Sequence, residues 1–192
     1  MQIFDHKNSY GWVSIALHWL TATLIISLWF IGNSIRSVGA VVSTYLSQLH
    51  VSIAAGGYLL FIFRIYWRRK SGHPKLVGQG DTLHLIGKIA HYLMLAFLIV
   101  LLISGPLILW ATGADIIIFN SLHIPSPTGY IKGLTALSHS IHYIASTALI
   151  ILVTLHLSAA FKHMMFHDDE TFLRIFWPKK IAPKSEVITS GE

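Results

Sequence analysis

Four long stretches of this chain contain no Asp, Glu, Lys or Arg, and this feature constrains its fold more than any other. They are residues 8–35, 37–63, 89–114 and 133–161. Each exceeds the roughly 20 residues with which an α-helix crosses a bilayer core of about 30 Å. Only helices and closed barrels satisfy their backbone hydrogen bonds in lipid. Because the runs are long and rich in Leu, Ile and Ala, we expect four transmembrane helices.

The composition supports a membrane solvent and excludes several kinds of site. Charged residues make up 11% of the chain, whereas soluble domains carry about a quarter. Without cysteine, the chain cannot form disulfides, iron–sulfur clusters or a covalently attached c-type haem. The net charge of +6 comes from basic residues that gather where the apolar runs end. That placement is typical of membrane topology signals, so we expect no nucleic-acid partner.

The segments between the apolar runs predict the orientation. Residues 68–75 are strongly basic and free of acids, and basic residues also follow the fourth run. The other two connections contain one basic residue each, Arg36 and Lys132. The positive-inside rule therefore places both termini in the cytoplasm. We expect one all-α domain over residues 1–192, with spans at about 12–35, 42–67, 84–110 and 136–163. We also expect an ordered or semi-ordered outer loop at about 111–135 and a polar tail at 167–192.

Histidines inside the apolar runs sort by depth into two pairs. His18 starts the first span and His156 ends the fourth, so both lie toward the cytoplasm. His50 starts the second span and His142 starts the fourth, so both lie toward the outside. Ionisable side chains at membrane depth are rare and usually functional. The sequence therefore predicts an inner and an outer histidine pair.

The spacing within the fourth span strengthens this interpretation. His142 and His156 are fourteen residues apart. At 1.5 Å per residue they are separated by about 21 Å, and at 3.6 residues per turn they share a face within about 40°. One helix then offers two ligands at two depths, as two macrocycles stacked in a four-helix bundle require.

Haem suits such pairs better than a bare metal ion. Zinc needs three or four protein ligands, and no carboxylate lies in the apolar runs. Haem supplies four nitrogens and needs only axial ligands from the protein. We therefore expect two haem b groups, with His18, His50, His142 and His156 bound to iron. Two alternatives remain: histidines that hydrogen-bond along a polar seam, and a haem-free transporter that uses them as proton or metal relays.

Other polar residues near these levels are candidates for a supporting role. Arg64 lies fourteen residues after His50, on nearly the same face at the inner level, where it either pairs with haem propionates or anchors the helix at the interface. His91, early in the third span, is a candidate contact for a propionate or a quinone. We expect His139 to face a loop, a propionate or the outer surface. For a quinone pocket we favour the region around Trp19, Arg64 and His91.

These residues together resemble the bacterial dihaem cytochrome b561 family. The resemblance lies in residues 15–20 around His18, in His50 followed by Arg64 and Arg68, in the spacing of His142 and His156, and in residues 166–174 after the fourth span. It covers nearly the whole chain. Carried over residue by residue, the axial ligands of the family fall on His18, His50, His142 and His156.

The resemblance implies a multi-pass protein of the bacterial cytoplasmic membrane, embedded in lipid, that exchanges electrons with ubiquinone or another quinone. It implies an electron donor at the outer face, either superoxide or a protein, and hence a superoxide:quinone or other quinone-linked oxidoreductase. The alternative it leaves open is a haem-bearing anchor subunit that relays electrons for a separate dehydrogenase or hydrogenase.

Overall fold

Four long helices and one small hairpin form the described part of the chain. A computed structural model describes residues 2–5, 9–71, 81–166 and 175–177. Its helices and strands are α1 (Trp12–Ser34), α2 (Ala40–Ser71), α3 (Asp81–Trp110), β1 (Ile116–Ile118), β2 (Leu122–Ile124) and α4 (Leu134–Phe166). All four helices are long and apolar enough to cross a membrane. The predicted all-α, transmembrane four-helix fold is confirmed.

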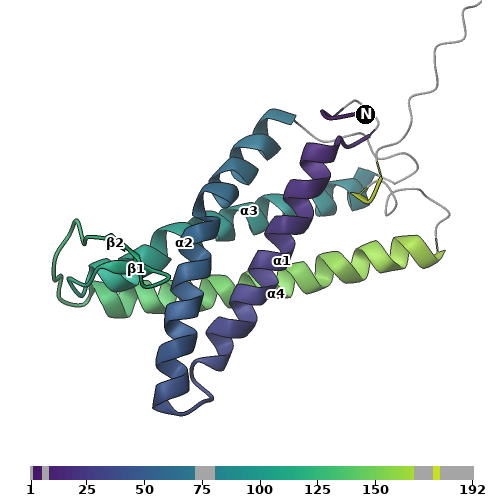
Figure 1. Ribbon diagram of the computed structural model, residues 1–192. Helices are drawn as coiled ribbons and strands as arrows, with labels where there is room; N and C mark the ends of the chain where they lie inside the picture. Colours follow the sequence, from purple (N-terminus) through teal and green to yellow (C-terminus); the bar gives the residue numbers. More distant parts are fainter. Residues whose placement is uncertain (1, 6–8, 72–80, 167–174, 178–192) are drawn as a thin grey trace, which may run out of the picture.

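The helices associate as two antiparallel pairs. α1 packs closely along α2, and α3 packs closely along α4, whereas few contacts join one pair to the other. In Figure 1 the α1–α2 pair crosses the α3–α4 pair at a clear angle. We call the end where α1 begins and α4 finishes the terminal end, and the opposite end, which carries β1 and β2, the hairpin end. The space between the two pairs is where the polar residues of the spans meet.

A proline inside α3 creates one of the links between the pairs. Pro106 has no N–H to donate, so the carbonyl of Leu102, four residues earlier, loses its helical hydrogen bond. The hydroxyl of Tyr58 on α2 donates to that carbonyl at 3.2 Å. A carbonyl left unpaired in an apolar interior would be costly, so Tyr58 both satisfies α3 and ties it to α2.

The N-terminal residues fold back over the start of α1. The Asp5 carboxylate accepts the Gly11 N–H at 2.6 Å and the Ser14 hydroxyl at 2.7 Å. The Trp67 indole of α2 donates to the same Ser14 hydroxyl at 2.7 Å. An acidic side chain suits the N-terminus of a helix, where backbone N–H groups lack partners. This arrangement caps α1 and joins it to the last turns of α2.

A short antiparallel hairpin lies within the connection between α3 and α4. Its strands pair in the register Ile116 with Ile124 and Ile118 with Leu122. The turn rests on α2, because the N–H of Phe119 donates at 2.9 Å to the hydroxyl of Ser52, which is 1% exposed. The sequence predicts an ordered or semi-ordered loop here but not these strands. The hairpin covers α2 two residues from His50.

Candidate cofactor site

Two pairs of histidines lie in the space between the helix pairs, and the two rings of each pair face each other. At the terminal end, His18 of α1 and His156 of α4 have ring centroids 6.5 Å apart. At the hairpin end, His50 of α2 and His142 of α4 have ring centroids 6.3 Å apart. The ring planes are inclined at 63° and 76° respectively. α4 contributes one histidine to each pair. The structure therefore brings together the same two pairs of histidines that the sequence predicts from their depth along the spans.

The separation of the rings suits one metal atom bound between each pair. Histidine nitrogen binds zinc at about 2.0 Å, and iron bonds are of similar length. With about 1.1 Å from nitrogen to ring centre on each side, two such bonds place axial imidazole centroids roughly 6.2 Å apart. The observed 6.5 and 6.3 Å lie close to this value. Both pairs therefore fit the axial positions of a haem.

A glycine lies against each ring at the hairpin end, and the closer of the two is Gly32. A Cβ on Gly32 of α1 would lie 3.1 Å from Cε1 of His50, and a Cβ on Gly105 of α3 would lie 3.4 Å from Cε1 of His142. Nδ1 of His142 lies 3.0 Å from the hydroxyl of Ser104. Nδ1 of His50 is buried, and no hydrogen-bond partner for it is found in the described part of the chain. A metal-bound histidine is usually oriented by a hydrogen bond at its second nitrogen, and the contact with Ser104 would serve this purpose if His142 held iron.

The terminal pair has a more polar environment. Arg64 of α2 places one guanidinium nitrogen 3.3 Å from Nδ1 of His18 and the other 3.4 Å from the carbonyl of Ser14. The ring of Trp19 lies edge-on to that of His18, with centroids 5.5 Å apart. Its indole N–H donates at 3.0 Å to the carbonyl of Ile175. Thus Arg64 and Trp19, both singled out in the sequence, flank His18.

His91 of α3 lies on the other side of the terminal pair. Its ring centroid is 4.9 Å from that of His156, with the planes inclined at 70°, and its Nδ1 is 2.8 Å from the carbonyl of Gly87. A separation of 4.9 Å is typical of direct edge-to-face packing and is too short for a metal atom bound between the two rings. His91 therefore supports His156 from the side, while His18 faces it at the distance that suits iron.

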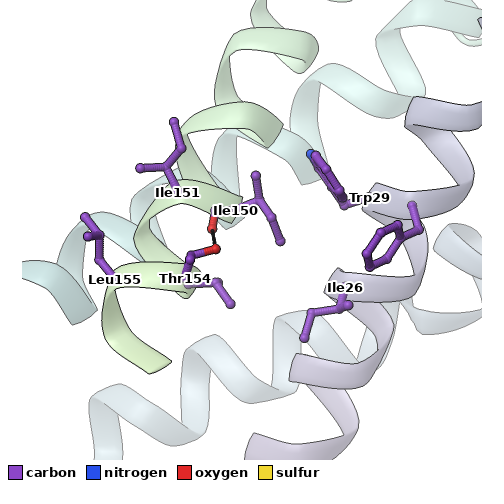
Figure 2. A pocket seen from close by; sticks show the side chains of 8 residues that line it. Ile26, Trp29, Ile150, Ile151, Thr154 and Leu155 are labelled. Carbon is purple, nitrogen blue, oxygen red and sulfur yellow. Dashed lines mark hydrogen bonds between the residues drawn. The ribbon is translucent and has the colours of Figure 1, made fainter. Parts of the chain in front are cut away.

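An apolar groove of about 440 Å³ lies between α1 and α4. Ile26, Trp29 and Phe30 line it from α1, and residues 150, 151 and 153–155 line it from α4. Figure 2 shows Ile26 and Trp29 across the groove from Ile150, with the Thr154 hydroxyl turned back onto its own helix, where it donates to the Ile150 carbonyl at 2.9 Å. Along α4 these residues fall between His142 and His156. The groove therefore provides apolar space between the levels of the two histidine pairs.

The donor groups do not suit a bare metal ion. In the described residues, no three His, Cys, Asp or Glu side chains are placed to hold one. Zinc requires such a set, whereas each pair here offers two imidazole rings at a separation that suits the two axial ligands of a haem iron.

Sequence reasoning missed the residues that support the rings. Gly32, Gly105 and Ser104 carry no recognisable motif, and their role depends on which helices cross at the level of each histidine. The sequence offers one signal for Gly32, which lies fourteen residues after His18 and therefore on the same face of the predicted helix. Most of the polar tail, apart from residues 175–177, and most of the predicted motif at 166–174 lie outside the described residues.

The sequence is similar to known proteins over most of its length. The model of the family described as prokaryotic cytochrome b561 matches residues 9–178. The chain is also similar to "Cytochrome b561 homolog 2" of Escherichia coli (strain K12). The two are 25% identical over 178 residues, which cover 91% of this chain and 95% of that protein.

Proposed function

The chain belongs to the prokaryotic cytochrome b561 family, and we propose that it binds two haem b groups and carries electrons across the bacterial cytoplasmic membrane to a quinone. Membership makes it a multi-pass bacterial membrane protein of the b-type cytochromes, which take part in electron transfer. The proposal adds the number of haems, their ligands, the direction across the bilayer and the acceptor.

One observation carries the proposal: two facing histidine pairs at two depths. Their shared helix separates the two levels by about 21 Å, a large part of the roughly 30 Å apolar core. His50 and His142 would hold one haem, and His18 and His156 the other. When bound, each haem supplies a one-electron couple between ferric and ferrous iron. Because a histidine fills each axial position, no coordination site is left for oxygen, which favours electron transfer over oxygen chemistry.

The basic residues support a cytoplasmic location for the terminal end. Arg68, Arg69 and Lys70 occupy the last turn of α2, and positively charged residues near the ends of spans remain in the cytoplasm. The pair formed by His50 and His142 then lies toward the outside. A donor at the outer face, such as superoxide or a reduced protein, would meet that pair first.

A quinone site fits the terminal end best. His91, Trp19 and Arg64 gather around the His18–His156 pair there. Arg64 and His91 offer hydrogen bonds to quinone oxygens, and the indole of Trp19 offers a flat surface for the ring. These contacts support the region as the place where a lipid-soluble acceptor takes electrons, and they support a propionate contact for Arg64 equally well.

Proteoliposomes test transfer across the bilayer directly. Ferricyanide trapped inside the vesicles is the acceptor, and an impermeant reductant is added outside. We expect the trapped ferricyanide to be reduced with the wild type, and reduction to stop with His142→Ala and with His156→Ala, since each removes one level. Vesicles that behave like empty liposomes would contradict the proposal.

A second assay addresses the quinone and the donor. Ubiquinone is added to the vesicle membrane, and superoxide is generated outside. Steady reduction of ubiquinone by the isolated protein would establish a quinone-linked oxidoreductase. Transfer to ferricyanide without quinone reduction, together with co-purification of a large dehydrogenase or hydrogenase subunit, would favour the anchor subunit instead.

A further inference from the structure

Arg36 forms a cluster with two aromatic rings, those of His139 and Tyr143, at the hairpin end. One guanidinium nitrogen of Arg36 is 3.3 and 3.5 Å from the two ring nitrogens of His139. Nearly equal distances place that nitrogen over the ring face, because an in-plane approach would collide with Cε1. The guanidinium carbon also lies 4.8 Å from the centre of the Tyr143 ring. The guanidinium of Arg36 thus lies against both aromatic rings.

The cluster lies one turn beyond the His50–His142 pair. Arg36 follows Gly32 by four residues, and Gly32 is the residue of α1 that contacts the ring of His50. α1 ends at Ser34, but Ile35 keeps helical dihedral angles, so the helical path continues almost to Arg36. On α4, His139 and Tyr143 lie three residues before and one residue after His142. Both helices therefore bring the cluster to the outer edge of the same site.

Stacked aromatic rings orient Arg36 without neutralising it. In the described part of the chain, the contacts of Arg36 are with these two rings and not with a carboxylate. Arg36 is exposed, as an arginine that anchors a helix end is, but its guanidinium also rests against two rings, which limit the directions in which its fork can point. A planar guanidinium matches a carboxylate through two parallel hydrogen bonds.

We propose that Arg36, His139 and Tyr143 form a carboxylate clamp that holds a propionate of the haem carried by His50 and His142. The proposal rests on the proposed function. Propionates are the charged groups of haem b, and charge is costly within the apolar core. They are best placed where a span ends, and Arg36 is the fixed cation at that place. A small anion from solution has the same chemistry as a propionate, so the test must separate the two.

The test compares four variants in the purified, haem-loaded protein. Arg36→Gln removes the charge, Arg36→Lys keeps the charge but not the fork, and His139→Gln removes one stacking ring. Lys132→Gln is the matched control, since it removes a cation from the same end of the molecule outside the cluster. The readouts are the rate at which each haem transfers to excess apomyoglobin, and the midpoint potential of each haem.

We expect Arg36→Gln to release one of its two haems about tenfold faster than the wild type, the scale of a lost hydrogen bond to a charged group. The midpoint potential of that haem should fall, because an uncompensated propionate favours ferric iron. Arg36→Lys and His139→Gln should give intermediate rates, and Lys132→Gln should match the wild type. The second haem should remain unchanged in every variant, which also reports that the bundle is folded.

Unchanged release rates and potentials in Arg36→Gln and His139→Gln would overturn the proposal. If those variants kept both haems as tightly as the wild type but reacted more slowly with superoxide, the cluster would serve a free anion instead. A wild type without haem would refute the proposed function itself, and that result is separate because it is read before any variant is made.

Discussion

Gly32 offers a graded test of how closely α1 is fitted to the His50 ring. A Cβ at this position would lie 3.1 Å from Cε1 and 3.3 Å from Nδ1 of His50, whereas carbon atoms in contact prefer about 3.5–4.0 Å. Gly32→Ala therefore forces the ring to move by roughly 0.3–0.5 Å. An off-rotamer side chain costs about 0.5–1.5 kcal/mol, which corresponds to a roughly 2- to 10-fold faster loss of the haem that we propose between His50 and His142. Gly32→Val adds two methyl groups, and overpacking of about 1–3 kcal/mol predicts a roughly 5- to 150-fold effect.

Haem transfer to apomyoglobin, followed by absorbance, measures this effect for each of the two haems. Gly56 provides the matched control, because a Cβ there has nothing within 4 Å, so Gly56→Ala and Gly56→Val should leave both haems in place. Gly105→Ala should be tolerated, since its Cβ would lie 3.4 Å from the His142 ring, an ordinary contact. If Gly32→Val released both haems at wild-type rates, the close fit between α1 and His50 would be refuted.

Other predictions follow from single contacts. Ser104→Ala removes the contact to Nδ1 of His142, and one haem should then be held about tenfold less tightly. Because the histidine becomes less basic, the midpoint potential of that haem should rise in a potentiometric titration. Arg64→Gln removes a positive charge beside His18, so the potential of the other haem should fall, on the order of 50 mV, in the same titration. Tyr58→Phe leaves the carbonyl opened by Pro106 unpaired and should cost about 1 kcal/mol of stability, seen as a lower midpoint in thermal unfolding. The ring planes of the two pairs are inclined at 63° and 76°. Crossed imidazoles bring two iron d orbitals close in energy, so we expect strongly anisotropic low-spin ferric signals in electron paramagnetic resonance. The rhombic signals that parallel imidazoles give would contradict that geometry.

The sequence predicts the four helices well because hydropathy measures the property that the bilayer selects. It is less informative where a helix leaves the lipid. α2 runs to Ser71 and carries Arg68, Arg69 and Lys70 in its last turn, where positive charge suits the negative end of the helix dipole. Apolar residues are no longer needed there, so hydropathy does not register the continuation.

Helical spacing also predicts which histidines share a depth. Fourteen residues along α4 define two levels on one face, and the structure places His18 opposite one and His50 opposite the other. That these four side chains bind iron stays a prediction. Spacing cannot show which residues of neighbouring helices support the rings. Gly32 and Ser104 depend on how the two helix pairs cross, and the contact of Tyr58 with Leu102 depends on a carbonyl opened by Pro106 in another helix.

The most direct test of the account is the visible spectrum of the purified protein, oxidised and reduced with dithionite, with haem quantified per chain. We predict two low-spin b-type haems per chain in the wild type, and one in each of His142→Ala and His156→Ala. His91→Ala should keep both, because His91 packs against His156 and does not face it across iron. A colourless wild type, or full haem content in both ligand variants, would contradict the central claim.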